Sequence, residues 1–220
     1  MNYLYLMIEI LLVIGLSFVS YKIGKKEGLF IYIGIMASVL SIVVCSSIDI
    51  LLFEVTMGLP IVMGIFMISN VIIHRYGLDE LVKIIKVFCV SSVVTYILLA
   101  LLSLTSNIEL FSNSYNELFG YNLFNIRLVI SEVIAITLML WINGQVYYYV
   151  RHSRNNFMIC NIGSILSVQF ILSMIYIIIS YTGVNNLIEI FGMIVISYLC
   201  KVVIGLIYLY PASILIKMKE

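Results

Sequence analysis

The sequence has few charged residues and few interruptions of its apolar runs. Only 10% of its 220 residues are charged, against about 25% in a typical soluble domain. Hydrophobic residues make up 63% of the chain, and the mean hydropathy is +1.17. A soluble protein of this length has too little interior to bury so much apolar surface. The composition therefore excludes a soluble enzyme, a disordered chain and a nucleic-acid-binding domain, and it makes the lipid bilayer the first expected partner.

The sequence also lacks the motifs of catalysis and of cofactor binding. Its four cysteines are far apart and belong to no CxxC pair, so we expect neither a metal site nor a disulfide framework. No GxGxxG, GK(S/T) or HExxH motif occurs, and no nucleophile stands beside a general base. We predict that the chain is not an enzyme and holds no cofactor. The first apolar run has no basic flank and no A-x-A site, so we expect a retained helix rather than a signal peptide.

Long apolar runs take up most of the chain. A spanning helix needs about 20 such residues, and seven runs qualify. They are Tyr3–Tyr21, Leu29–Ile48, Met57–Ile73, Ile84–Leu104, Phe124–Val150, Ile159–Tyr181 and Leu187–Tyr210. The predicted fold is an all-α polytopic membrane bundle, with residues 1–220 forming a single transmembrane domain. Six spans remain the alternative if the first or the third run does not cross fully.

The loops between these runs alternate in charge. Ten of the twelve basic residues lie in every second connection or in the C-terminal tail: Lys22, Lys25, Lys26, Arg75, Lys83, Lys86, Arg151, Arg154, Lys217 and Lys219. The other connections carry acidic residues only. The positive-inside rule then predicts a multi-pass protein of the cell membrane with its N-terminus outside and its C-terminus in the cytoplasm. The longest connection, Thr105–Leu123, is expected to form an interfacial helix or a lid.

Four charged residues lie beyond the first three residues of a predicted span, namely Glu9, Arg127, Glu132 and Lys201. A charge at mid-depth costs about 2.5–3.5 kcal/mol on insertion scales, so it normally faces a cavity or a partner. Arg127 has the alternative of extending toward the outer interface. Lys201 has the alternative of a structural ion pair with Glu132 or Glu9.

Uncharged polar residues form a second group within the spans. It includes Ser69, Asn70, Asn143, Gln145, Asn161, Ser167 and Gln169. Buried amides can hold helices together through hydrogen bonds worth about 0.6–2 kcal/mol. They can equally bind the edge of a planar polar ligand, and a group of them facing two cations favours such a site.

An ordered set of segments resembles the queuosine precursor transporters, also called the vitamin uptake transporter (VUT) family. In chain order the segments are Tyr21–Phe30, Glu54–Gly58, Arg127–Ser131, Asn161 with Ser167, and Lys201 followed by Pro211. The resemblance covers nearly the whole chain. It implies an importer of 7-deazaguanine bases such as preQ0 and preQ1, which are planar and rich in hydrogen-bonding groups. The chain departs from the family by lacking acids at Asn70 and His74, near Asn143, near Ile171 or Leu172, and before Pro211.

The predicted substrate site lies among the third, fifth, sixth and seventh runs. Its residues are Asn70, Arg127, Glu132, Asn143, Asn161, Ser167 and Lys201. Two other functions stay open at this point. The chain is then either a substrate-binding subunit that needs a separate ATP-driven module, or a membrane interaction protein that kept the fold and lost transport. Homo-oligomerisation is also left open.

Overall fold

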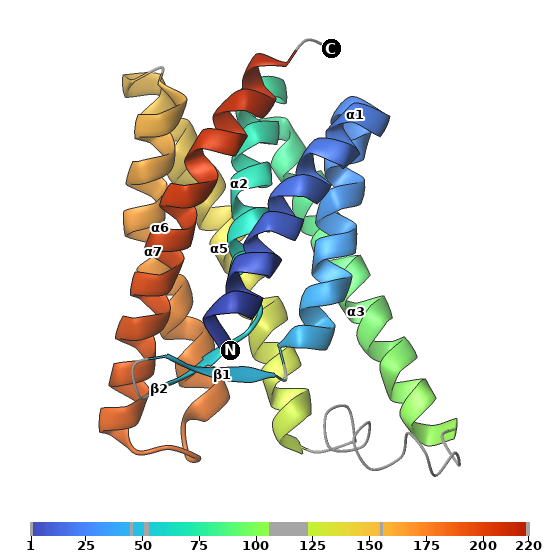
Figure 1. The fold of residues 1–220 in the computed structure, drawn as a ribbon, viewed down its shortest axis with the longest axis vertical. Helices are drawn as coiled ribbons and strands as arrows, with labels where there is room; N and C mark the ends of the chain where they lie inside the picture. The colour runs from blue at the N-terminus through green and yellow to red at the C-terminus, as the bar shows by residue number, and fades with distance from the viewer. Residues whose placement is uncertain (1, 45, 51–52, 106–122, 155, 219–220) are drawn as a thin grey trace.

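The structure, a computed structural model, describes residues 2–44, 46–50, 53–105, 123–154 and 156–218. Within these ranges it contains six helices long and apolar enough to cross a membrane, together with a short 3₁₀ helix, η1 (Leu78–Glu80), and a small antiparallel hairpin. The protein is an all-α polytopic membrane bundle (Figure 1), as the composition predicts. The predicted outer loop falls largely on residues 106–122, outside the described part of the chain.

The helices follow the predicted apolar runs closely. They are α1 (Asn2–Val43), α2 (Leu59–Tyr76), α3 (Leu81–Thr105), α5 (Leu123–Ser153), α6 (Phe157–Tyr181) and α7 (Leu187–Lys217). Helices suit a lipid bilayer because each helix satisfies its own backbone hydrogen bonds, and lipid offers no hydrogen-bonding groups in their place. Several helices extend past the predicted ends into the polar loops, where the backbone keeps its helical hydrogen bonds.

Helix α1 holds the first two predicted spans, because it folds back on itself. Its 42 residues would reach about 63 Å as a straight helix, roughly twice the apolar thickness of a bilayer. The backbone leaves the helical region at Lys25, with φ 50° and ψ −121°. A Cβ at Gly28 would lie 1.9 Å from the carbonyl oxygen of Ser20, so only glycine allows the two arms to approach so closely. Figure 1 shows both arms, so α1 accounts for two of the seven predicted runs.

A two-stranded hairpin links α1 to α2. Strand β1 (Ser47–Ile50) pairs with β2 (Phe53–Thr56), with Ser47 opposite Thr56. The second predicted span is therefore too long, since its helix ends at Val43 and its last residues begin the hairpin. The predicted runs leave residues 49–56 as a connection and give no sign of the hairpin. The hairpin satisfies backbone groups at one end of the bundle, next to the start of α2.

Helix α2 occupies the centre of the bundle. Every residue from Leu59 to Ile73 is buried, because α1, α5, α6 and α7 all pack around this helix. A Cβ at Gly64 would come within 2.5 Å of both the Tyr32 hydroxyl and Val13, which shows how closely α1 and α2 approach. Polar side chains on α2 therefore face protein rather than lipid. By contrast, α3 leans away from the other helices at its C-terminal end (Figure 1).

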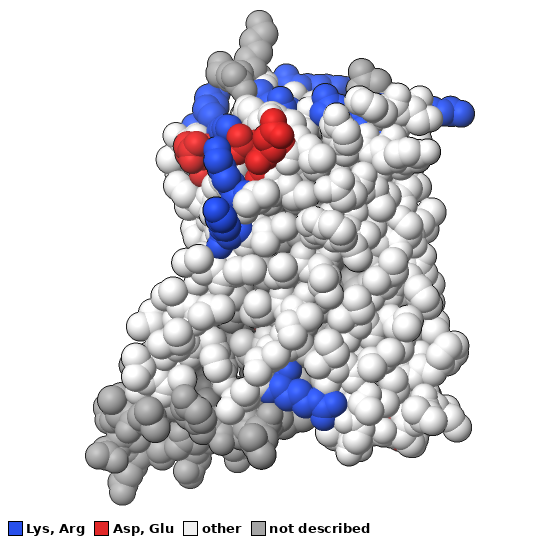
Figure 2. Space-filling model, turned by 180° about the vertical axis from the view of Figure 1, so that it is seen from behind, with Lys and Arg blue, Asp and Glu red and all other residues white. Residues whose placement is uncertain are grey.

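The two ends of the bundle differ in charge. Figure 2 shows Lys and Arg side chains gathered at one end, above a broad belt without charge. This end includes the turn of α1, the end of α2, the start of α3, the α5–α6 connection and the end of α7. We call it the basic end, and the opposite one the hairpin end. The N- and C-termini lie at opposite ends in Figure 1, as an odd number of crossings requires.

Candidate functional site

A cavity near the hairpin end holds two of the charged residues predicted for the site. Glu132 from α5 and Lys201 from α7 both line it. The remaining lining residues are Leu40, Val44, Thr56, Leu59, Val62, Ala135, Ile136, Leu172 and Tyr176. The cavity volume is about 30 Å³, which has room for water and admits a ring system only if the surrounding helices move apart. Two opposite charges thus project into one small, mainly apolar space.

These two charged groups have few hydrogen-bond partners and no ion pair with each other. The side chains of Glu132 and Lys201 are only 2% and 3% exposed. Lys201 Nζ donates a hydrogen bond of 2.9 Å to Ser173 Oγ on α6. Neither carboxyl oxygen of Glu132 has a hydrogen-bond partner among the described residues, and no ion pair joins it to Lys201. The predicted alternative of a structural ion pair between these two residues is therefore not what the structure shows.

The two ionisable groups at the cavity complement a molecule that offers both donors and acceptors. A carboxylate only accepts hydrogen bonds, and an ammonium group only donates them. A molecule placed between Glu132 and Lys201 would satisfy both if it carried N–H donors on one side and a carbonyl oxygen on the other. The apolar walls from α1, α2 and α6 suit a flat ring system.

The three predicted asparagines form a continuous chain of hydrogen bonds across three helices. Asn143 Nδ2 on α5 donates to Asn70 Oδ1 on α2 over 2.6 Å. Asn70 Nδ2 donates to Asn161 Oδ1 on α6 over 2.7 Å. Asn161 Nδ2 completes the chain by donating to the carbonyl of Phe157 over 2.8 Å. All three side chains are 0% exposed, so we call Asn70, Asn143 and Asn161 the amide triad.

A second polar layer lies one helical turn closer to the basic end. Tyr147 Oη and His74 Nδ1 share a hydrogen bond of 2.9 Å. The Phe157 ring packs edge-on against His74, with ring centroids 5.4 Å apart. Beyond it, Arg151 Nη1 donates to the carbonyl of Ile73 over 3.2 Å. Polar contacts between α2, α5 and α6 thus continue from the amide triad to the basic end.

Two other predicted residues lie away from the cavity and from the triad. Arg127 donates from Nε to the carbonyl of Ile179 and from Nη2 to that of Thr182 over 2.7 Å. It therefore binds the C-terminal end of α6, where unpaired carbonyls and the helix dipole favour a cation. Ser167 is exposed and donates to the carbonyl of Gly163 in its own helix over 2.8 Å. The structure thus places neither side chain beside Glu132 and Lys201.

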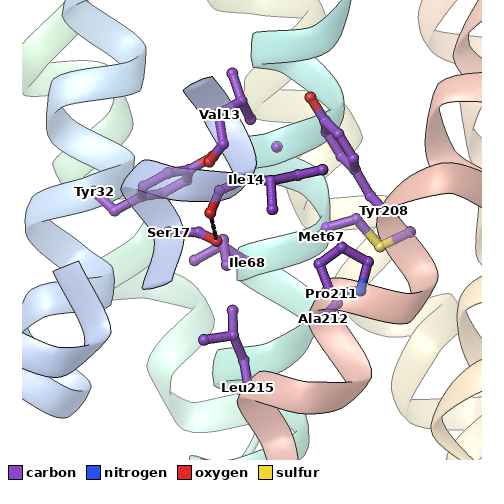
Figure 3. Close-up of a pocket in the computed structure, with 11 residues that line it drawn as sticks. Val13, Ile14, Ser17, Tyr32, Met67, Ile68, Tyr208, Pro211, Ala212 and Leu215 are labelled. Atoms are coloured by element: carbon purple, nitrogen blue, oxygen red, sulfur yellow. Dashed lines mark hydrogen bonds between the residues drawn. The ribbon is translucent and has the colours of Figure 1, made fainter. Parts of the chain in front are cut away.

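A second cavity lies between the first arm of α1, α2 and α7 (Figure 3). Its volume is about 20 Å³, and it is lined mainly by apolar side chains. Its hydroxyl groups already donate to backbone carbonyls: Ser17 to Ile14, Tyr32 to Val13 and Tyr208 to Pro60. This cavity offers a polar ligand far less than the Glu132–Lys201 cavity does.

Several residues at the cavity were not predicted from the sequence. Ser173 holds Lys201, and it follows Gln169 by four positions on the same face of α6, a spacing that the sequence already contains. Tyr176 extends that face into the cavity. Thr56 could not be found in this way, because it reaches the cavity from the hairpin, which the apolar runs do not reveal.

Comparison with known proteins identifies the family. Residues 56–216 match the family model described as "Putative vitamin uptake transporter". This match covers most of the chain, including α2, α5, α6 and α7, which carry the charged cavity and the amide triad. No curated protein and no solved structure matches the chain. The protein is a multi-pass membrane protein, and it belongs to the vitamin uptake transporter family.

Proposed function

We propose that this protein imports a neutral 7-deazaguanine base of the preQ0 type, a precursor of queuosine. The observation that carries the proposal is the shared cavity of Glu132 and Lys201. Membership of the vitamin uptake transporter family supports small-solute uptake as the general activity. The resemblance to queuosine precursor transporters suggests the ligand class. The hydrogen-bonding groups and the charges at the cavity can be compared with those of such a ligand.

The polar edge of such a base complements the two charged groups. Its pyrimidine ring carries a ring N–H and an exocyclic amine side by side, which suits a two-point interaction with the Glu132 carboxylate. The carbonyl oxygen on the same edge accepts from Lys201, which keeps its bond to Ser173. The flat rings then lie against apolar side chains of α2 and α6. Glu132 would gain the hydrogen-bond donors that it lacks, and Lys201 would gain a second acceptor beside Ser173.

The charge balance of the cavity favours a neutral ligand. One carboxylate and one ammonium group line the described walls, so a neutral base leaves the site close to electroneutral. The aminomethyl group of preQ1 adds a second cation. Because no further acidic side chain lines the cavity, this cation would lack a counter-ion in a low-dielectric space. PreQ0, with a nitrile at that position, avoids the cost.

We also propose that the basic end faces the cytoplasm. The positive-inside rule places loops rich in Lys and Arg on that side. The charged cavity, near the hairpin end, is then closer to the external face. A substrate would enter the cavity first and leave at the basic end.

Uptake by the purified protein in liposomes tests the proposal. We expect vesicles containing the wild-type chain to accumulate labelled preQ0 over protein-free vesicles, and we expect unlabelled preQ0 to compete better than adenine. Vesicles that bind preQ0 but do not take it up would indicate a substrate-binding subunit that needs an energising partner. Vesicles that do neither would contradict the proposal and favour a protein without transport activity.

A further inference from the structure

The amide triad is too far from the charged cavity to belong to the same ligand site. Asn143 follows Glu132 by eleven positions on α5, which corresponds to about 16 Å along a helix. A single two-ring base cannot touch both residues at once. The triad also lies nearer the basic end, since Asn161 is close to the start of α6 and Asn70 is in the second half of α2. It therefore needs an explanation of its own.

Two buried acceptors near the triad lack partners. Asn143 Oδ1 and Gln169 Oε1 accept no hydrogen bond from any described residue. Both side chains are 0% exposed, and Gln169 makes only a weak contact of 3.6 Å from Nε2 to the sulfur of Met139. An amide used only to hold helices together gains most when all its groups are satisfied. Unused acceptors of this kind are able to receive donors from a ligand.

The positions of these amides connect the cavity to the basic end. Gln169 lies one turn from Ser173, the partner of Lys201, and two turns from Asn161 on the same helix. Met139, which contacts Gln169, lies one turn from Asn143. Past the triad, the Tyr147–His74 pair continues the polar contacts. Groups that can form hydrogen bonds thus occur along α5 and α6 from the charged cavity to the basic end.

We propose that Asn70, Asn143, Asn161 and Gln169 form a second binding site for the same planar base, occupied after the base leaves the charged cavity. The inference rests on the proposed function. Side-chain amides offer the same groups as the edge of the base, namely N–H donors and carbonyl oxygens. A base that enters the triad exchanges each amide–amide bond for an amide–base bond. It also supplies N–H donors to the two unused acceptors, so its passage leaves few buried groups unsatisfied.

The inference separates binding from transport, because the second site acts only after the first. The test compares Asn143→Ala with Gln145→Ala, an exposed amide two positions away on the same helix. Asn161→Ala provides a second variant on another helix, in case the first does not fold. Folding is checked by gel filtration and thermal melting in detergent. The readouts are the Kd for labelled preQ0 and the initial rate of preQ0 uptake in liposomes.

We expect Asn143→Ala to keep its Kd within about twofold and to lose at least tenfold in uptake rate, while Gln145→Ala changes neither. An equal loss of affinity, as expected for Glu132→Gln, would place the triad in the first site and overturn the inference. Unchanged uptake would make the triad a helix contact only. Faster uptake would make it a barrier only. A wild-type chain that does not bind preQ0 would overturn the proposed function and this inference with it.

Discussion

Glu132 and Lys201 face one cavity from α5 and α7 without forming an ion pair with each other. Each is nearly fully buried, and Lys201 has the Ser173 hydroxyl as its hydrogen-bond partner. A buried charge costs free energy unless it is paired. The arrangement therefore costs stability in the empty protein, and the proposed ligand, by contacting both groups, would recover part of that cost.

Removing the charge of Lys201 should stabilise the empty protein and impair binding. Lys201→Met keeps the chain length and removes a buried ammonium group whose cost is about 2.5–3.5 kcal/mol on insertion scales. We expect the Tm in detergent to rise by about 2 °C or more, and the affinity for preQ0 to fall at least tenfold, which corresponds to about 1.4 kcal/mol. Thermal melting and ligand titration of the same preparation measure both effects.

Glu9→Gln serves as the matched control for this prediction. Glu9 is a second acid well inside a predicted span, and it does not line the charged cavity. We expect its affinity for preQ0 to equal that of the wild type. A Lys201→Met protein that is less stable than the wild type and binds preQ0 normally would contradict the account of the cavity.

The cavity should discriminate between two closely related bases. PreQ1 differs from preQ0 in carrying an aminomethyl cation, and Lys201 already supplies one cation to the described walls. We expect preQ1 to bind at least tenfold more weakly than preQ0 in competition titrations at pH 7. A base without the exocyclic amine should also bind more weakly, because it loses one contact to Glu132. Equal affinities for all three bases would show that these charges do not select the ligand.

Arg127 should matter for stability rather than for binding. Its guanidinium group holds the carbonyls of Ile179 and Thr182 at the end of α6. Hydrogen bonds of charged groups contribute about 1.5–3 kcal/mol, and we expect Arg127→Ala to lower stability by about that amount. The Kd for preQ0 should stay within about twofold. A large loss of affinity at unchanged Tm would instead assign Arg127 to the substrate site.

The turn within α1 gives a prediction about folding. Gly28→Ala would place a methyl group 1.9 Å from the Ser20 carbonyl oxygen, so the two arms of α1 would have to separate. We expect a loss of about 3 kcal/mol or more, as for a severe overpacking substitution, visible as poor accumulation and early melting. Gly24→Ala in the same turn meets no atom within 4 Å and should behave as the wild type. Similar melting of the two variants would refute the folded-back geometry.

Much of the fold could be predicted from the apolar runs, since a membrane forces such runs into helices. The predicted ends were wrong mainly at the hairpin. Residues 47–56 mix polar and apolar side chains over a distance too short for a clear period of two. The fold of α1 was implied by the charges around Lys25, but the close contact of Gly28 with Ser20 depends on tertiary geometry.

The site was only partly predictable. The cost of charge in lipid drew attention to Glu132 and Lys201, and the structure places both at one cavity. The contacts between Asn70, Asn143 and Asn161 could not be derived, because the sequence does not state which helices are neighbours. The same limit applies to Arg127, whose partners are backbone carbonyls on α6, and no sequence pattern marks these as ligands.

The most direct test of the central claim is the queuosine content of tRNA in cells that depend on uptake. The host is a bacterium that cannot make queuosine precursors and lacks its own importer, supplied with nanomolar preQ0. We predict that the wild-type chain and Glu9→Gln restore queuosine and that Glu132→Gln, present in the membrane at the same level, does not. Equal restoration by Glu132→Gln, or none by the wild-type chain, would contradict the assignment of the Glu132–Lys201 cavity to preQ0 import.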